Sequence, residues 1–269
     1  MARDKGKGER DMRARMYIAA VWLSLSAGSA TAHFNMLLPQ SVSAKKGEAI
    51  TLLYQWGHPF EHQLFDAPRP QSLIVLTPDG KKTELTDKLE KTMLKTGDKE
   101  VTAYQLRFTP QQRGDHIFVL RTPPIWLEED GEFLQDTVKT VLHVQAQKGW
   151  DKSVGEFELV PLARPYGLRP GTVFQIEMQV EPASRGDLGL VEVERYNAVP
   201  PRKLPPDEYI TRTVRLDPNG IATTTLSEPG WWCLTVGRLN GTRMQQGKSY
   251  PLRQRSTFWV WVDEAARSE

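Results

Sequence analysis

The sequence contains a single cysteine, Cys233, among its 269 residues. One thiol cannot form an intramolecular disulfide or supply the several thiolates of a cysteine-rich metal site. We interpret Cys233, which lies in an alternating segment, as a buried thiol. The sequence also lacks a glycine-rich phosphate loop, a nucleophile elbow and an ordered set of Ser, His and Asp. We therefore predict no catalytic residues.

The sequence also has no large excess of positive or negative charge. The whole chain has a formal net charge of +2. Of its 35 basic and 33 acidic residues, six basic and three acidic ones precede His33, which leaves −1 on residues 33–269. No basic patch remains that would favour nucleic acid as a partner.

The apolar run between Met16 and Ala27 is short, and rich in Ser and Gly, for a membrane span. Basic residues precede it, and Ala30-Thr31-Ala32 follows with the small-x-small pattern of a signal peptidase site. We predict that residues 1–32 are a signal peptide and that cleavage makes His33 the first residue. The protein would then be periplasmic, or tethered to the membrane if the leader stays attached.

No long amphipathic helical pattern is present. Short segments that alternate with a period of two, separated by Pro and Gly turns, predict an all-β protein. We expect two β-sandwich domains, an immunoglobulin-like one over residues 33–147 and a second one over residues 156–263, with a linker at 148–155. The predicted strands are 49–55, 72–77, 102–108, 116–121 and 137–146, then 156–161, 172–180, 189–196, 211–216, 221–226, 230–236 and 257–262.

Two local patterns refine this prediction. The tight turn Asp217-Pro218-Asn219-Gly220 lies between two of these strands, and we expect it to join them as a hairpin. The tryptophans near the end of the chain alternate within predicted strands, which favours core packing over a sugar-binding platform. They are Trp231, Trp232, Trp259 and Trp261.

The stretch Trp56-Gly57-His58-Pro59-Phe60-Glu61-His62 contains two of the chain's five histidines and one carboxylate. Gly57 and Pro59 end the preceding strand, so this stretch is predicted to form a loop at a strand end, where sites are often located. Imidazole and carboxylate together suit nickel, cobalt, copper or zinc. The alternative is a turn in which the histidines only hydrogen-bond to nearby backbone.

An amino-terminal histidine would offer both its α-amine and its ring to one metal ion. We expect residues 34–38 to form an edge strand beside the strand that ends at Gln55, which would bring His33 close to the loop. The predicted metal site therefore consists of His33, His58 and His62, with Glu61 as a ligand or as a group that orients an imidazole. The patterns around the two remaining histidines, His116 and His143, favour structural roles, with completion of a metal site by either one as the alternative. The acidic connection 122–135 favours a solvated hairpin tip, with a lid that supplies a carboxylate as the alternative.

Several motifs together resemble a known family. They are the leader that ends in Ala-His-Phe, the loop Gly57–His62, the segment Pro161–Leu168, the turn Asp217–Gly220 and Gly230-Trp231-Trp232. The sequence resembles the bacterial periplasmic domain-of-unknown-function 4198 family, formerly labelled a nickel-uptake component similar to NikM. The resemblance implies a soluble accessory protein of metal uptake and a second domain of the transthyretin or carboxypeptidase-regulatory type.

Three hypotheses follow for the function. The first is an exported protein that binds a divalent transition metal (nickel, cobalt or copper) and hands it to an inner- or outer-membrane transporter, without enzymatic activity. The second is an oxidative copper enzyme of the histidine-brace kind. The third is a structural or adhesive module that binds no metal. The sequence indicates no oligomeric state.

Overall fold

The computed structural model describes residues 33–264 of the chain. Their regular structure consists of 18 strands and three short 3-10 helices, and no α-helix occurs among them. The prediction of an all-β protein is confirmed. None of the helices described is long and apolar enough to cross a membrane. The predicted signal peptide, residues 1–32, and its cleavage site lie outside the described residues.

The first sheet has five strands and contains the start of the described chain. Its order is β1-β3-β8-β7, and β4 pairs with the end of β3. The prediction that residues 34–38 form an edge strand beside the following strand is confirmed, because β1 pairs antiparallel with β3. The strands are β1 (Phe34–Pro39), β3 (Ile50–His58), β4 (Gln63–Phe65), β7 (Glu90–Thr96) and β8 (Lys99–Phe108).

The second sheet has ten strands, in the order β15-β14-β17-β18-β11-β9-β5-β6, with β10 and β2 paired to β11. Its central junction is the parallel pairing of β11 with β18, from Phe133↔Leu252 to Thr140↔Trp259. The strands are β2 (Ser43–Ala44), β5 (Ser72–Leu76), β6 (Lys82–Glu84), β9 (Gly114–Arg121), β10 (Ile125–Leu127), β11 (Glu132–Val144), β14 (Val191–Arg195), β15 (Thr211–Val214), β17 (Gly230–Gln245) and β18 (Lys248–Val262).

This sheet contains strands from both sides of the predicted linker at 148–155. The division into two domains stays a prediction, and the structure adds that the ten-stranded sheet continues across the predicted boundary.

A third sheet of three strands, in the order β12-β13-β16, follows the linker. Its strands are β12 (Glu158–Pro161), β13 (Thr172–Gln179) and β16 (Ile221–Leu226), and the 3-10 helices are η1 (Thr86–Lys88), η2 (Pro182–Asp187) and η3 (Asp207–Tyr209).

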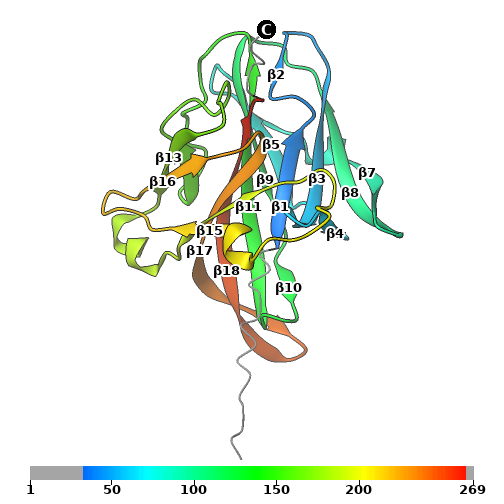
Figure 1. Cartoon of the computed structure of the whole chain (residues 1–269), viewed down its shortest axis with the longest axis vertical. Helices are drawn as coiled ribbons and strands as arrows, with labels where there is room; N and C mark the ends of the chain where they lie inside the picture. The colour runs from blue at the N-terminus through cyan, green and yellow to red at the C-terminus, as the bar shows by residue number, and fades with distance from the viewer. Residues whose placement is uncertain (1–32, 265–269) are drawn as a thin grey trace, which may run out of the picture. The chain divides into compact units, whose positions relative to one another are not determined.

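The ten-stranded sheet has a hydrophobic core on each face. Figure 1 shows β13 and β16 on one side of β11 and β18, and β3, β8 and β7 on the other. Neighbouring residues of β18 divide between the two cores: Trp259 packs with residues of the first sheet, and Phe258 packs with Phe174 and others of the third. Because successive side chains of a strand point to opposite faces, the run Phe258–Val262 is apolar throughout.

The core also contains the residues predicted to be buried near the end of the chain. Cys233 is a free, buried thiol, and burial raises its pKa well above the ordinary value. Trp231, Trp232 and Trp259 are each at most 8% exposed. Trp231 and Trp259 belong to the first core and Trp232 to the second, and Trp261 packs against the first core while partly buried.

The predicted hairpin of residues 211–216 and 221–226 is wrong. The turn forms, with Asp217 donating its backbone N–H to Ile221 and Gly220 to Asp217. However, β15 pairs with β14 in the ten-stranded sheet, whereas β16 pairs with β13 in the third. The burial of Ala222, Thr224 and Leu226 gives the reason, because this face of β16 packs beside β13 in the second core.

Candidate metal centre

The pairing of β1 with β3 brings two of the predicted ligands together. Phe34 lies opposite Gly57, so His33 and His58 follow this pair at the same end of the two strands. The centroids of their imidazole rings are 4.7 Å apart, with the rings inclined at 66°. Thus the first described residue and the last residue of β3 form one histidine pair, as the sequence predicts.

The hairpin that follows His58 is set by Gly57. Gly57 pairs with Leu64 of β4, and a Cβ atom at Gly57 would lie 2.1 Å from the carbonyl oxygen of Gln63. Only glycine allows the backbone of β4 to approach this closely. The chain therefore reverses over Pro59–His62, and His58 is fixed at the rim of the sheet.

The hydrogen bond of His58 determines which ring nitrogen is available to a ligand. His58 Nδ1 lies 3.2 Å from Oε1 of Gln63, an atom that only accepts, so Nδ1 carries the proton. The other nitrogen, Nε2, then has a free lone pair. This atom is buried and has no hydrogen-bond partner. An imidazole with one nitrogen held by an oxygen and the other free has the usual arrangement of a metal ligand.

Aromatic side chains enclose the pair. The ring of Phe65 lies 5.4 Å from that of His33 and 5.1 Å from that of His58, and Trp56 lies 5.6 Å from His33. His33 is half-buried and His58 is 7% exposed. Burial, followed by the nearby His58, lowers the pKa of His33 below 6.5, which keeps its imidazole neutral at pH 7.

Two acidic residues lie close enough to act on the charge of His33, where the guanidinium of Arg255 opposes them. Asp130 and Glu129, in the turn between β10 and β11, act on His33 in the opposite sense and raise its pKa. Figure 1 shows β10 close to the start of β1. The connection predicted as an acidic hairpin tip is such a tip, since β10 pairs antiparallel with β11. Carboxylates around neutral imidazoles favour a cation as the ligand.

A buried polar network fixes the backbone of the strand that carries His33. Arg255 donates two hydrogen bonds of 2.7 Å to Asp136 and a third to the carbonyl oxygen of His33. Asp136 also accepts a 2.7 Å hydrogen bond from Asn35, whose amide oxygen accepts from Tyr54 at 2.8 Å. We call Arg255, Asp136 and Asn35 the amino-terminal clamp. Because its members are almost fully buried, it holds the backbone at His33 in one place.

The His58 hairpin is attached to the second half of the chain. Glu194 of β14 accepts a hydrogen bond from the backbone N–H of Phe60 at 3.1 Å. Asn197 donates its side-chain amide to the carbonyl of Phe60 at 2.6 Å and its backbone N–H to that of Pro59 at 3.0 Å. Burial raises the pKa of Glu194 to about 8, so this carboxyl group is protonated at pH 7.

The other two predicted ligands, His62 and Glu61, belong to the turn that connects the His58 hairpin with the second half of the chain. The ring of His62 packs 5.7 Å from that of Tyr196, and burial lowers its pKa. Glu61 is half-buried, and its charge contributes to the raised pKa of Glu194. Across residues 33–264, no group of three or more His, Cys, Asp and Glu side chains is arranged to hold a metal ion. The structure therefore joins His33 with His58, while the ring of His62 packs against Tyr196 of the second half of the chain.

The two remaining histidines have structural partners. His143 Nδ1 is 2.8 Å from a carboxylate oxygen of buried Asp115, and its ring stacks on Tyr166 at 4.2 Å. The Tyr166 hydroxyl donates to the other oxygen of Asp115 at 3.1 Å. His116 Nδ1 bonds to the carbonyl of Gly114 and its ring packs against Phe108, while its Nε2 is buried without a partner and has no second histidine beside it. Neither belongs to the His33–His58 pair.

Sequence reasoning missed Gln63, Phe65 and the amino-terminal clamp. A signal for Gln63 was present, since it follows the turn directly and so faces His58 across a hairpin. A signal for Asn35 was also present, as the one polar residue in the apolar segment Phe34–Leu38. Arg255 and Asp136 had no local signal, because their contact with β1 depends on how distant strands pair.

Fold and site together define an exclusively β-stranded, sandwich-like protein with a histidine pair at the start of its first strand. The sequence matches the family model described as domain of unknown function DUF4198 over residues 30–238. The chain belongs to this family, which confirms the resemblance found in its motifs. No curated protein sequence matches the chain at a significant level.

Solved structures give weak likenesses only. Salmonella α2-macroglobulin reacted with methylamine aligns with 84% of this chain at 15% identity and a TM-score of 0.24. Trypsin-activated α2-macroglobulin from Escherichia coli aligns with 87% at 12% identity and a TM-score of 0.22. The chain spans 15% and 16% of the length of these two proteins. The fibronectin(III)-like modules of Clostridium thermocellum CbhA align with 87% of this chain, over 97% of their own length, at 10% identity and a TM-score of 0.21.

Proposed function

We propose that this protein is an exported binding protein for a divalent transition metal and that it serves as an accessory to metal uptake. The observation that carries the proposal is the buried, unpartnered Nε2 of His58 beside the imidazole of His33. A buried polar atom without a partner is costly in free energy, and a bound ion would remove that cost. His33 and His58 are the residues that would hold the metal.

The proposed ligand set includes the amine of His33, which becomes available when the leader is removed after Ala32. The chain would then supply one amine and two imidazoles, and the clamp on the carbonyl of His33 would limit the movement of the new terminus. His62 and Glu61 are left out of the set because no group of three such side chains forms among the described residues, and the ring of His62 packs on Tyr196. The metal is the cargo of the protein in this proposal, to be delivered to a transporter in the inner or outer membrane.

Nitrogen ligands of this kind suit nickel, cobalt and copper. Among divalent ions the general order of stability favours copper in the test tube, whichever ion is bound in the cell.

For the fold we keep the finer assignment of an immunoglobulin-like first half and a transthyretin-like second half as part of the proposal. It is supported by the short antiparallel strands of the first sheet and the separate three-stranded sheet of the second half.

Isothermal titration with copper, nickel, cobalt and zinc tests the proposal. The matched pair is protein beginning at His33 and protein with one additional alanine before His33. The authentic form should bind one equivalent of metal, and the extended form at least about tenfold more weakly, because the added residue converts the amine into an amide. Equal affinity of the two forms would remove the amine from the ligand set. Absence of binding by the authentic form would leave the structural or adhesive module as the function.

Intact mass of protein recovered from the periplasm tests the export step separately. We expect a mass that begins at His33. A mass that retains Ala32 or earlier residues would contradict the proposed site, even if the recombinant protein binds metal.

A further inference from the structure

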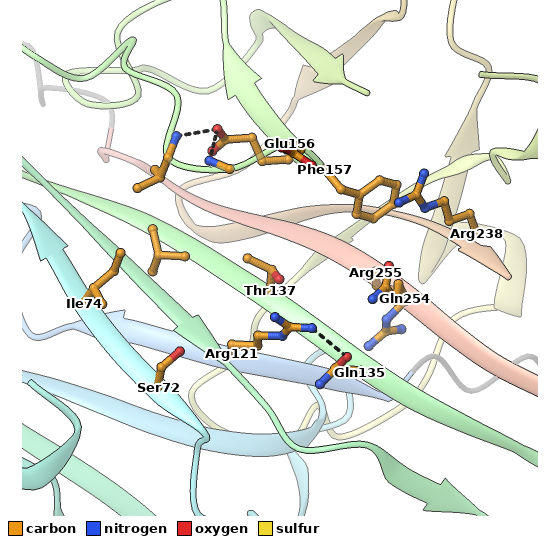
Figure 2. Close-up of a pocket in the computed structure, with 14 residues that line it drawn as sticks. Ser72, Ile74, Arg121, Gln135, Thr137, Glu156, Phe157, Arg238, Gln254 and Arg255 are labelled. Carbon is orange, nitrogen blue, oxygen red and sulfur yellow. Dashed lines mark hydrogen bonds between the residues drawn. The ribbon is translucent and has the colours of Figure 1, made fainter. Parts of the chain in front are cut away.

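A cavity of about 490 Å³ lies on the face of the ten-stranded sheet that belongs to the second core. Its floor consists of side chains from neighbouring strands. Ile74 of β5 pairs with Val119 of β9, and Gln135 of β11 pairs with Gln254 of β18. Figure 2 shows these strands running below Phe157, which belongs to the segment before β12. The volume is within the usual range for small-molecule sites.

Two arginines extend into the cavity without a carboxylate partner. Arg121 donates one hydrogen bond, of 3.2 Å, to the amide oxygen of Gln135. The guanidinium of Arg238 stacks on the ring of Phe157 at 4.4 Å, and its Nε is buried without a hydrogen-bond partner. Figure 2 shows Arg121 beside Gln135 and Arg238 against Phe157. Among the ion pairs of the described residues, neither guanidinium is neutralised.

The other charged groups near the cavity are already paired or exposed. Glu158 bonds to Lys139 at 2.8 Å and accepts from the backbone of the preceding loop, and Arg255 is paired with Asp136. Glu156 is exposed to solvent. Arg121 is exposed as well, at the rim of the cavity, whereas Arg238 is half-buried and its Nε is a buried donor that calls for an acceptor.

We propose that this cavity binds a small organic carboxylate. Guanidinium groups bind planar carboxylates through pairs of hydrogen bonds, which gives Arg121 and Arg238 their role. Ile74, Val119 and Phe157 offer apolar surface to the rest of such a molecule, and Thr137 offers a hydroxyl group. The proposal does not depend on the metal site, because the histidine pair packs against Trp56 of the first core.

Titration of ¹⁵N-labelled protein with hexanoate, followed by NMR, tests this site. Hexan-1-ol serves as the uncharged probe of the same chain length, and inorganic phosphate serves as the anion without an apolar part. We expect saturable shifts of amides around the cavity with hexanoate and at least about tenfold weaker binding of the other two probes. Equal binding of hexan-1-ol would show that the arginines play no part. Equal binding of phosphate would overturn the assignment to an organic ligand.

Variants locate the binding. Arg121→Gln and Arg238→Gln should each weaken hexanoate binding at least about tenfold. Arg212→Gln is the matched control, since Arg212 also stacks on an aromatic ring, that of Trp232 at 4.9 Å, and lies outside the cavity. Val119→Trp should abolish binding by filling the cavity while both arginines remain. The proposal is overturned if Arg238→Gln and Arg212→Gln bind alike, or if Val119→Trp binds as the unaltered protein does.

Discussion

Two histidine clusters of this protein differ in what their ring nitrogens contact. His143 bonds to the buried carboxylate of Asp115 and stacks on Tyr166, which itself bonds to Asp115. His58 bonds to an amide oxygen and has a buried nitrogen without a partner. The first arrangement is complete without a ligand and joins two parts of the chain. The second leaves a lone pair available, which is what a ligand site requires.

Each cluster also includes a buried aspartate, Asp115 in the first and Asp136 in the second. The two aspartates differ in whether they contact the histidine ring. Asp115 contacts the His143 ring directly, so that histidine is part of the structural network. Asp136 accepts hydrogen bonds from Asn35 of β1 and from Arg255, which holds the carbonyl of His33. It makes no hydrogen bond to the imidazole of His33 or His58. The comparison predicts that substitutions at the first cluster change stability only, whereas substitutions at the second can change metal binding without loss of stability.

The largest effect is expected for Asp136→Ala. Loss of this carboxylate leaves Arg255 buried and uncompensated, which should lower the free energy of unfolding by about 3–5 kcal/mol. Urea unfolding measures it, with Asp98→Ala on an exposed turn as the control. A loss of less than about 1 kcal/mol would mean that the clamp is not a structural centre.

Asp115→Ala should cost about 2 kcal/mol of stability, because His143 and the Tyr166 hydroxyl both lose a buried partner. Metal affinity measured by titration should stay within about twofold of the unaltered protein. A large drop in metal affinity of a folded Asp115→Ala protein would break the distinction between the two clusters.

His58→Ala should lower metal affinity at least about tenfold, or roughly 1.4 kcal/mol of binding free energy. Some stability should also be lost, because the buried ring packs against Phe65 and bonds to Gln63, so affinity is measured where the variant is fully folded. His143→Ala is the matched control and should bind metal as the unaltered protein does. Unchanged affinity in His58→Ala would contradict the proposed site.

Glu194→Gln sharpens the comparison by testing how the His58 hairpin is attached. The pKa of Glu194 is about 8 in the folded protein, above its ordinary value of 4.5. The folded state therefore retains a proton that the unfolded state releases, and stability falls as the pH rises from 4.5 towards 8. Glutamine stays neutral, so the variant should be more stable than the unaltered protein at pH 8, by at least about 1 kcal/mol, and nearly equal at pH 5.

Urea unfolding at pH 5, 6, 7 and 8 measures this difference, with the exposed Glu100→Gln as the control. A difference that does not widen with pH would show that Glu194 is already ionised at pH 7.

The smallest effect is expected for Gln63→Leu. The variant removes the acceptor that holds the proton on Nδ1 of His58, so both tautomers become populated. Metal affinity should fall roughly threefold, with little change in stability. Gln105→Leu on the first sheet is a suitable control. An effect as large as that of His58→Ala would make Gln63 a direct participant in binding.

The sequence predicted those features that depend on neighbours along the chain. The alternation of residues 49–55 predicted β3, and the apolar segment after His33 predicted β1 and its pairing, from which the approach of His33 to His58 followed. The position of His62 was not predictable in this way. Its backbone φ of 52° turns the residue out of the strand, and its contact with Tyr196 requires β14 to lie nearby.

Sheet order was the other feature without a local signal. Arg255 and Asp136 pair across adjacent parallel strands that are 119 residues apart in the sequence. Periodicity predicts which faces of a strand are buried but does not specify the neighbouring strand.

The lengths of β17 and β18 were underestimated for a different reason. Their far ends, around Asn240 and Ser249, are polar and exposed, so they resemble a loop by composition.

The clamp has a consequence for the order of events during biosynthesis. The guanidinium of Arg255 reaches the carbonyl of His33 from a point 222 residues later in the chain. Contacts this distant form late, because a long loop must close before they contribute free energy. The strand β1 can pair with β3 early, but the carbonyl of His33 would lack its contact with Arg255 until β18 has been synthesised and inserted beside β11. In this order, the proposed metal site would reach its final geometry only after β18 has been added, because the clamp that holds the backbone of His33 is completed last.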